Sequence, residues 1–426
     1  MTQAPILDQR NMTTPFRISL GLLIILTVVM PNSYPTLSFL LLISAACFVL
    51  FAKPFFSIPR LLIYFWMASL FVTILYMLVG ALNGATLEAL KQTMLIYIIS
   101  PILWTIIMVH WLRCRGIEQI SRLLVLLVFP CAISVVVFFF LFLNYGPSST
   151  RVFISSSNID FSNGTVAATM HVYGSMIFFA GGIFAAPNIF QNRTVRLLAI
   201  ISVITIAATS GRGALIIAIF LGLLVSIISS ASRTIRPRRF VLFVVGTGAT
   251  LFLVALVSAY FAVDLTLLIT DLLNRILNIS HSIRGQQVSH LARGIADSSG
   301  FGMGHGIGVD YIRSEKYPWR YEAVWVATLY RVGLLGAIAY VVPFIYFFWR
   351  IATTQIRREL STGERFLFGA FTAVFAASAT NPYLEAFAFQ WMYILPISAM
   401  VLRNNSIDCS IPKVHAPDAS SSSVRV

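Results

Sequence analysis

The sequence Gly302-Met303-Gly304-His305-Gly306-Ile307-Gly308, followed by Tyr321-Glu322-Ala323-Val324-Trp325, lies where a long polar segment gives way to an apolar run. The polar segment covers residues 263–321. The rest of the chain consists mainly of apolar runs of roughly 16–25 residues, each long enough to cross a bilayer as a helix. The sequence therefore predicts an all-α polytopic integral membrane protein with one large loop.

The composition supports this fold class. Hydrophobic residues make up 58% of the 426 residues and charged residues only 11%, against about 25% charged in an ordinary soluble domain. In a soluble protein the net charge of +15 would suggest nucleic-acid binding. Here the Lys and Arg residues fall in loops between apolar runs, where they set membrane topology. We therefore expect no nucleic-acid partner.

The cysteines show no spacing typical of a metal site or a disulfide framework. They are Cys47, Cys114, Cys131 and Cys409. The cysteines therefore predict neither a disulfide framework nor a cysteine metal site.

About twelve membrane-spanning helices are expected, each uncertain by a few residues at its ends. They lie near residues 16–31, 35–52, 60–82, 91–112, 121–144, 165–187, 195–209, 213–230, 239–262, 322–349, 365–380 and 386–402. The seventh and eighth are separated only by Ser210-Gly211-Arg212.

The loop charges alternate along the chain and predict its orientation. Most Lys and Arg residues fall on one side, and most of the others lie within residues 263–321. Because basic loops stay in the cytoplasm, both termini are predicted to be cytoplasmic and this segment periplasmic, in a bacterial inner membrane. The chain then divides into 1–262 with nine spans, 263–321 as the periplasmic loop with amphipathic helices, 322–402 with three spans, and 403–426 as a disordered cytoplasmic tail.

Arg212 is the first candidate functional residue. It stands at the predicted outer end of two spans, in Thr209-Ser210-Gly211-Arg212-Gly213. The flanking glycines let the chain turn sharply and bring the guanidinium close to a ligand. A snorkelling arginine is the alternative, but it would lie on the side where arginine is disfavoured. We therefore favour a functional role.

Within the loop, His281, Arg284 and Gln287 recur at every third residue and so share one face of a predicted helix. A guanidinium binds phosphate through paired hydrogen bonds, so Arg284 together with Arg212 suits a diphosphate. A solvated polar face is the alternative for Arg284. His281 and Arg293 are further candidates for a substrate cleft.

The glycine run 302–308 invites a nucleotide-binding interpretation. It follows no predicted strand and belongs to no βαβ unit, so the context of a dinucleotide motif is missing. We expect a tight re-entrant turn above the next span. His305 is expected to be structural rather than a ligand, although it stays a candidate for the substrate cleft.

Glu322 is predicted to open the tenth span. At about 100° per residue, Val326, Leu329, Gly333 and Gly336 would share its face. The glycines would let a neighbouring helix approach, so Glu322 would point into the bundle. A carboxylate there could act as general base toward an attacking sugar hydroxyl. A carboxylate that interacts with the helix dipole is the alternative.

Two further groups complete the candidates. Arg331 lies about half a turn round the predicted helix from Glu322, so we expect it to face away and to pair elsewhere. Asn381-Pro382-Tyr383 with Glu385 forms the last predicted outward turn and is a candidate lining of an acceptor cleft. An ordinary Asn-Pro turn is the alternative.

Together these residues resemble the O-antigen ligase and polymerase superfamily of bacterial glycan assembly, which includes exopolysaccharide polymerases. Residues 209–215 are similar to the family's Ser-Arg-Gly-Ala-Leu stretch, and Arg284, the glycine run and Glu322 follow in the family's order. Asn381-Pro382 resembles the family's turn before the last span. Ligases carry a histidine, leading a His-Asn pair, where this chain has Glu322-Ala323, and that departure favours a polymerase. The resemblance covers the C-terminal half.

The resemblance implies a GT-C-like helical bundle and metal-independent glycosyl transfer that builds an O-antigen or exopolysaccharide. The donor and the acceptor would be glycans linked to undecaprenyl diphosphate, held among membrane lipids, with a chain-length regulator as a candidate partner. No nucleotide sugar or cofactor is required. Arg212 and Arg284 would hold the diphosphate leaving group, and Glu322 would be the base.

Two alternatives stay open. A ligase would transfer the finished glycan to lipid A–core or another acceptor. A lipid-linked oligosaccharide flippase or another transporter would need charges near the bilayer midplane and interruptions in several helices. In this sequence the charges gather at the predicted outer face, with Arg331 the clear exception.

Overall fold

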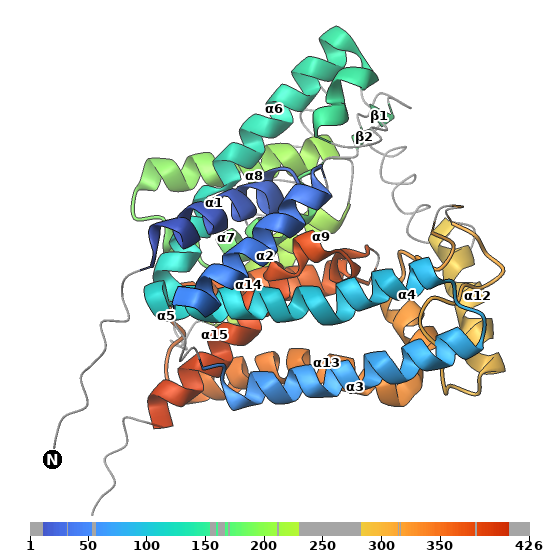
Figure 1. Ribbon diagram of the computed structural model, residues 1–426. Coiled ribbons are helices and arrows are strands. Elements are labelled where there is room, and N and C mark those ends of the chain that lie inside the picture. Colours follow the sequence, from blue (N-terminus) through green and yellow to red (C-terminus); the bar gives the residue numbers. More distant parts are fainter. Residues whose placement is uncertain are drawn as a thin grey trace, which may run out of the picture.

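A computed structural model describes most of the chain. The described residues are 12–31, 33–52, 57–153, 159–160, 167–168, 171–210, 213–229, 283–313, 315, 317–379 and 381–408. Within these ranges the chain is almost entirely helical (Figure 1). The predicted ninth span, 239–262, lies outside them.

The helices are long and mostly apolar. The α-helices are α1 (Thr14–Val29), α2 (Pro35–Ala52), α3 (Arg60–Leu82), α4 (Leu87–Met94), α5 (Ser100–Leu126), α6 (Val128–Tyr145), α7 (Tyr173–Ala185), α8 (Arg193–Ser210), α9 (Gly213–Ile228), α12 (Ile283–Asp297), α13 (Val324–Arg357), α14 (Thr362–Ala377) and α15 (Trp391–Asp408). Between them lie the π-helical turn η1 (Leu95–Ile99) and the 3₁₀ turns η2 (Pro147–Val152), η4 (Pro187–Ile189), η6 (Tyr383–Glu385) and η7 (Phe387–Phe389). Two short strands, β1 (Ile159–Asp160) and β2 (Ala167–Ala168), pair antiparallel with Ile159 opposite Ala168.

Within the described part of the chain, three helical stretches are long and apolar enough to cross a membrane: Arg60–Leu82, Leu87–Tyr145 and Val324–Arg357. Large apolar side chains point outward from the first of them, with Phe71 69% exposed and Leu78 60% exposed. Such surfaces are covered by lipid or by a partner rather than by water. These helices indicate association with a membrane.

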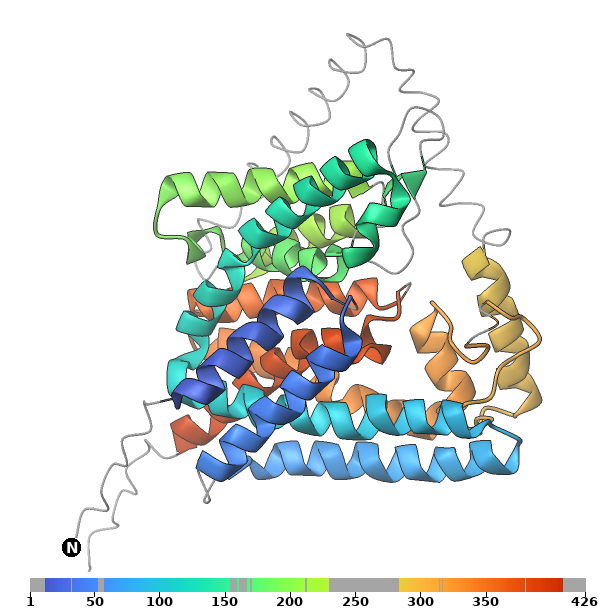
Figure 2. The ribbon, with the colours of Figure 1, turned by 45° about the horizontal axis from the view of Figure 1, so that its top comes forward.

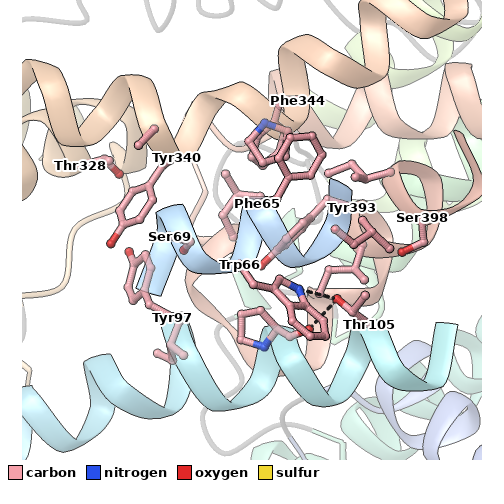
Figure 3. A pocket seen from close by; sticks show the side chains of 18 of the residues that line it. Phe65, Trp66, Ser69, Tyr97, Thr105, Thr328, Tyr340, Phe344, Tyr393 and Ser398 are labelled. Carbon is pink, nitrogen blue, oxygen red and sulfur yellow. Dashed lines mark hydrogen bonds between the residues drawn. The ribbon is translucent and has the colours of Figure 1, made fainter. Parts of the chain in front are cut away.

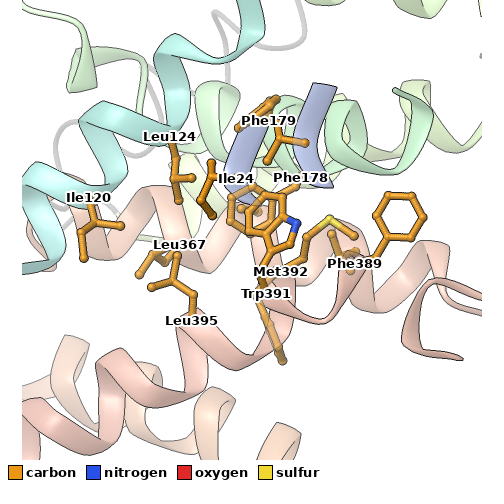
Figure 4. Close-up of a cluster of buried hydrophobic side chains, with 14 of the residues drawn as sticks. Ile24, Ile120, Leu124, Phe178, Phe179, Leu367, Phe389, Trp391, Met392 and Leu395 are labelled. Atoms are coloured by element: carbon orange, nitrogen blue, oxygen red, sulfur yellow. The ribbon is translucent and has the colours of Figure 1, made fainter. Parts of the chain in front are cut away.

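The centre of the bundle is formed by α7, α9 and α14, which pack on one another at small residues. A Cβ atom on Gly181 of α7 would overlap the carbonyl oxygen of Gly369 in α14, and one on Gly222 of α9 would overlap the carbonyl oxygen of Gly181. Small residues let helix backbones approach closely. Beside them, Trp391 of α15 packs edge-on against Phe178 with ring centroids 4.8 Å apart (Figure 4).

Most predicted apolar helices match observed ones, and α2 and α3 have the predicted bounds, 35–52 and 60–82. The loop expected between residues 112 and 121 is reduced to a kink, because two helical segments of α5, which ends at Leu126, meet directly at Gly116. The chain turns there at a single residue, Gly116, whose φ of +71° breaks the helix without a loop. A glycine adopts this left-handed backbone conformation without steric cost.

The helices α3, α13 and the run α4–η1–α5 lie lengthwise beside one another (Figures 1 and 2). The helix α3 runs toward the end where α12 lies, and α13 runs away from it. Arg60 at the start of α3 and Arg357 at the end of α13 therefore share the opposite end. There the buried carboxylate of Glu364 binds Arg358 and Arg403 and caps α14 together with Ser361.

The glycine run interlocks with a break in α13. Gly333 has φ +61° and ψ −175°, which interrupts the helix. The amide of Met303 donates to the carbonyl of Tyr330 (2.8 Å), and that of Gly304 donates to the carbonyl of Arg331 (2.9 Å). The run thus satisfies carbonyls that the break leaves without helical partners. On its other side Gly304 lies directly against Gly80 of α3.

Because of this break, the prediction that Gly333 and Gly336 share one helical face with Glu322 is wrong. A face containing both Gly333 and Gly336 requires an unbroken helix, whereas α13 is interrupted at Gly333. Gly333 lies against the carbonyl oxygens of Gly300 and Phe301 rather than against a neighbouring helix. Gly336 does face a neighbouring helix, at Tyr76 of α3.

Replacing Gly333 with alanine is expected to destabilise the fold. The added Cβ would overlap the carbonyls of Gly300 and Phe301, and the backbone conformation alone costs about 1–3 kcal/mol for a residue other than glycine. Thermal unfolding in detergent measures the effect. Gly21→Ala in α1 is the matched control, because its Cβ would meet no atom within 4 Å. Equal unfolding temperatures for Gly333→Ala and the wild type would refute the interlock.

Candidate functional site

The candidate site centres on the carboxylate of Glu322, which lies between two arginines. Nε of Arg284 donates to Oε2 at 2.8 Å, and a terminal nitrogen of Arg313 donates to Oε1 at 2.6 Å. The carboxylate is 22% exposed, and the two guanidinium side chains are 45% and 35% exposed. The cluster therefore carries a net positive charge at a surface that a ligand can reach.

The helix α12 positions this cluster by packing on the start of α13. Leu291 of α12 is buried with Tyr321 and Tyr330, and Gly294 lets the ring of Tyr330 approach closely. The buried side-chain oxygen of Gln287 accepts a hydrogen bond from the backbone amide of Glu322 (2.9 Å). The predicted shared face of Arg284 and Gln287 is confirmed, since both reach Glu322.

The predicted position of Glu322 is wrong in two respects. The helix α13 begins at Val324, so Glu322 precedes it and is not in its first turn. Its side chain does not point into the bundle but binds the arginines of the outer segment. The carboxylate of Glu322 therefore pairs with Arg284 and Arg313 instead of interacting with the dipole of α13.

A second charged pair, Arg331 and Glu385, is buried. One terminal nitrogen of Arg331 donates to Glu385 and to the Tyr97 hydroxyl (3.4 Å), and the other donates to the carbonyl of Trp319 (2.7 Å). Tyr97 also donates to Glu385 (3.0 Å). The prediction that Arg331 pairs elsewhere than with Glu322 is confirmed. The pair joins α13, η1 and η6.

His305 is buried at the junction of the glycine run with α3 and α13. Its Nε2 hydrogen-bonds the Tyr340 hydroxyl (3.1 Å), which in turn bonds Thr73 of α3 (2.7 Å). Its ring packs against Tyr97 with centroids 4.9 Å apart. Burial, with the nearby positive charge of Arg331, lowers the pKa of His305 to about 3. These contacts agree with the expected structural role.

Acidification is expected to destabilise the protein through His305. The folded chain keeps this imidazole neutral down to about pH 3, whereas the unfolded chain protonates it near pH 6.5. The unfolded state therefore binds more protons in this window, and stability falls as the pH falls below about 6.5. Between pH 7 and 4.5 the contribution is about 2–3 kcal/mol.

Unfolding curves at several pH values test this dependence. His305→Gln should flatten the slope of stability against pH between 4.5 and 6.5. Equal slopes for the wild type and His305→Gln would rule out the neutral buried imidazole.

The other predicted cleft residues lie apart from the Glu322 cluster or outside the described residues. Arg293 is exposed on α12 and forms no described hydrogen bond or ion pair with Glu322. The amide of Asn381 donates to the Ala377 carbonyl at the end of α14 (3.3 Å), and Tyr383 packs edge-on against a phenylalanine ring. For Asn381, this contact favours the alternative of an ordinary Asn-Pro turn over the lining of an acceptor cleft. Arg212 and His281 are not among the described residues, so the predicted convergence of Arg212 with Arg284 stays a prediction.

An apolar cavity of about 150 Å³ lies between α3, η1, α13 and α15. Figure 3 shows Phe65, Trp66, Tyr340, Phe344 and Tyr393 around it. Tyr97 and Tyr340 stand at one side of this cavity, with nearly parallel rings 5.7 Å apart. An engineered apolar cavity of about this size holds a benzene molecule. The space therefore suits a short hydrocarbon segment.

Sequence reasoning missed Arg313 and Arg320. Both lie in the stretch between the glycine run and α13, where arginines were counted only as loop charges. Aromatic residues beside a group of cations were the signal that the sequence offered, since Tyr317 and Trp319 closely precede Arg320. Among the described residues, no three His, Cys, Asp or Glu side chains gather as they would around a metal ion.

Comparison with protein-family models finds no match for the chain. Comparison with curated protein sequences likewise finds no significant match.

Proposed function

We propose that the protein is a glycan polymerase that joins repeat units carried on undecaprenyl diphosphate. The observation that carries this proposal is the carboxylate of Glu322 held between Arg284 and Arg313. The cluster combines an acceptor for a proton with two cations for an anionic leaving group. Glycosyl transfer from a lipid diphosphate requires both functions at one place.

In the proposed reaction, a hydroxyl of the acceptor glycan attacks the anomeric carbon of the donor's first sugar. The new C–O bond forms as the bond to the diphosphate oxygen breaks, and the electron pair leaves with the diphosphate. Glu322 takes the hydroxyl proton as general base. Arg284 and Arg313 stabilise the charge that develops on the departing diphosphate. A single displacement of this kind inverts the anomeric configuration.

The ion pairs give Glu322 a substrate-dependent role. Each of its oxygens accepts a hydrogen bond from a guanidinium while no substrate is bound. A diphosphate carries more negative charge than one carboxylate and binds guanidinium groups in the same forked geometry. Its arrival would draw Arg284 and Arg313 away from Glu322. The carboxylate would then be available for the acceptor hydroxyl.

The apolar cavity supports a lipid-linked substrate. Its size fits a segment of hydrocarbon such as one isoprene unit, by comparison with the benzene-sized cavity of about 150 Å³. It lies between α3, η1, α13 and α15, and α13 begins two residues after Glu322. In this proposal a bundle of about twelve spans of the GT-C kind, in a bacterial inner membrane, holds the cluster at the periplasmic face.

The buried pair of Arg331 and Glu385, together with the broken helix α13, would also suit a transporter. Arg331 lies only seven residues after the start of α13, which is about 10 Å along a helix. Its charge is compensated by Glu385, and the break at Gly333 is closed by the glycine run. These contacts favour a static structural role over an ion pathway.

Deletion of the gene in its native host tests polymerase against ligase. Loss of the protein should leave glycans of a single repeat unit. Accumulation of full-length polymer that stays on the lipid carrier would instead identify a ligase. Long polymers transferred as in the wild type would reject both activities.

A further inference from the structure

A small polar cavity of about 20 Å³ lies between η1, the glycine run and the start of α13. Gln92, His305, Arg320, Arg331 and Glu385 line it. The space holds about one water molecule. Two of the five named side chains are guanidinium groups and one is a carboxylate, so with neutral His305 the cavity carries a net positive charge.

The hydrogen-bond donors of this cavity are not all used. Nε of Arg331 is buried and has no hydrogen-bond partner among the described residues, although both terminal nitrogens are engaged. The guanidinium of Arg320 lies over the ring of Tyr317 at 4.6 Å and forms no described side-chain hydrogen bond. A buried donor without a partner is unfavourable, because it has lost its hydrogen bond to water. The cavity is therefore prepared for a ligand with acceptor atoms.

Electrostatics favour an anionic ligand. Burial lowers the pKa of Arg320, the carboxylate of Glu385 raises it, and the neighbouring positive charge of Arg331 lowers it to a smaller extent. The single carboxylate already accepts hydrogen bonds from Arg331 and Tyr97. An additional negative charge would offset the unfavourable proximity of the two cations.

The surroundings of the cavity also resemble a sugar-binding lining. Trp319 is nearly buried and donates from Nε1 to the side-chain oxygen of Gln92 (2.9 Å). Tyr317 packs edge-on against Trp319 with ring centroids 5.9 Å apart. Tyrosine and tryptophan side chains offer an apolar ring together with a polar atom, which suits the mixed surface of a sugar ring.

We propose that this cavity binds the carboxylate of an acidic sugar in the substrate glycan. A planar carboxylate matches the fork of a guanidinium, and it needs less room than a tetrahedral phosphate. Arg320 precedes Glu322 by two residues, so their Cα atoms are at most about 7 Å apart. A sugar anchored here would lie beside the proposed base. The origin of this sugar in a lipid-linked glycan rests on the proposed function.

Binding of free monosaccharides tests the site without requiring turnover. The protein is placed in lipid nanodiscs, and saturation-transfer NMR measures the affinity for D-glucuronate and for D-glucose. Glucuronate should bind saturably and glucose should not. Arg320→Gln should weaken glucuronate binding at least about tenfold, because a hydrogen-bonded charge pair is lost. Arg320→Lys keeps the positive charge but lacks the forked guanidinium. Its affinity for glucuronate should therefore lie between those of the wild type and Arg320→Gln.

Arg151→Gln is the matched control, because it removes an equal charge from the exposed turn η2 and should bind like the wild type. Equal binding of glucose and glucuronate would overturn the proposal, as would unchanged affinity in Arg320→Gln. Displacement of glucuronate by inorganic phosphate at much lower concentration than by acetate would contradict a carboxylate site. Glucuronate binding by a protein that extends no glycan would reject the proposed function and leave this site standing.

Discussion

Replacing Glu322 with glutamine is expected to lower the rate of chain growth by about 100- to 10,000-fold, the range that general acid–base catalysis contributes. Glutamine has nearly the same size and its carbonyl oxygen still accepts a hydrogen bond from Arg284 or Arg313. It does not take a proton from the acceptor hydroxyl. The fold should therefore persist while the chemical step slows.

A single-turnover assay with lipid-linked repeat units measures this loss. Glu315→Gln is the matched control, because Glu315 lies exposed in the same segment and outside the cluster. Its rate should equal that of the wild type. A full rate in Glu322→Gln would remove Glu322 from the proton transfer and leave only a structural role for the ion pairs.

Replacing Glu385 with glutamine is expected to destabilise the protein by about 3–5 kcal/mol, because it leaves the buried guanidinium of Arg331 without a counter-charge. Arg331 is 4% exposed and Glu385 is 7% exposed, so water compensates neither group. Thermal or denaturant unfolding in detergent measures the change. The effect should far exceed that of removing an exposed carboxylate such as Glu359.

A double-mutant cycle separates the pair from its surroundings. Arg331→Met combined with Glu385→Gln removes both charges, and this variant should recover much of the stability that Glu385→Gln loses. Additive losses in the double variant would show that the two residues act independently. That result would contradict the buried pair as the link between α13 and η6.

The positions of the helices follow from sequence because hydrophobic length is a local property. The bounds of α2 and α3 match the predicted runs for this reason. The break in α13 is different, because a glycine in an apolar run also fits an unbroken helix. Only the tertiary contact with Gly300 and Phe301 forces Gly333 out of the helical conformation.

The candidate site could also be predicted from the sequence in part. Arg284 and Gln287 could be placed on one face of a helix from their spacing, and both contact Glu322. Arg313 lies nine residues before Glu322 in a stretch without regular structure, so no periodicity relates them. The pairing of Arg331 with Glu385 joins residues 54 apart. Charges within apolar sequence indicate that such a partner exists, but not which residue it is.

The central claim is that the Glu322 cluster catalyses extension of a lipid-linked glycan. Purified protein in liposomes, supplied with undecaprenyl-diphosphate-linked repeat units alone, tests it most directly. The wild type should produce a ladder of longer lipid-linked glycans, and the Arg284→Ala, Arg313→Ala double variant should produce none. Absence of any product longer than one repeat unit with folded wild-type protein, or an equal ladder from the double variant, would contradict the claim.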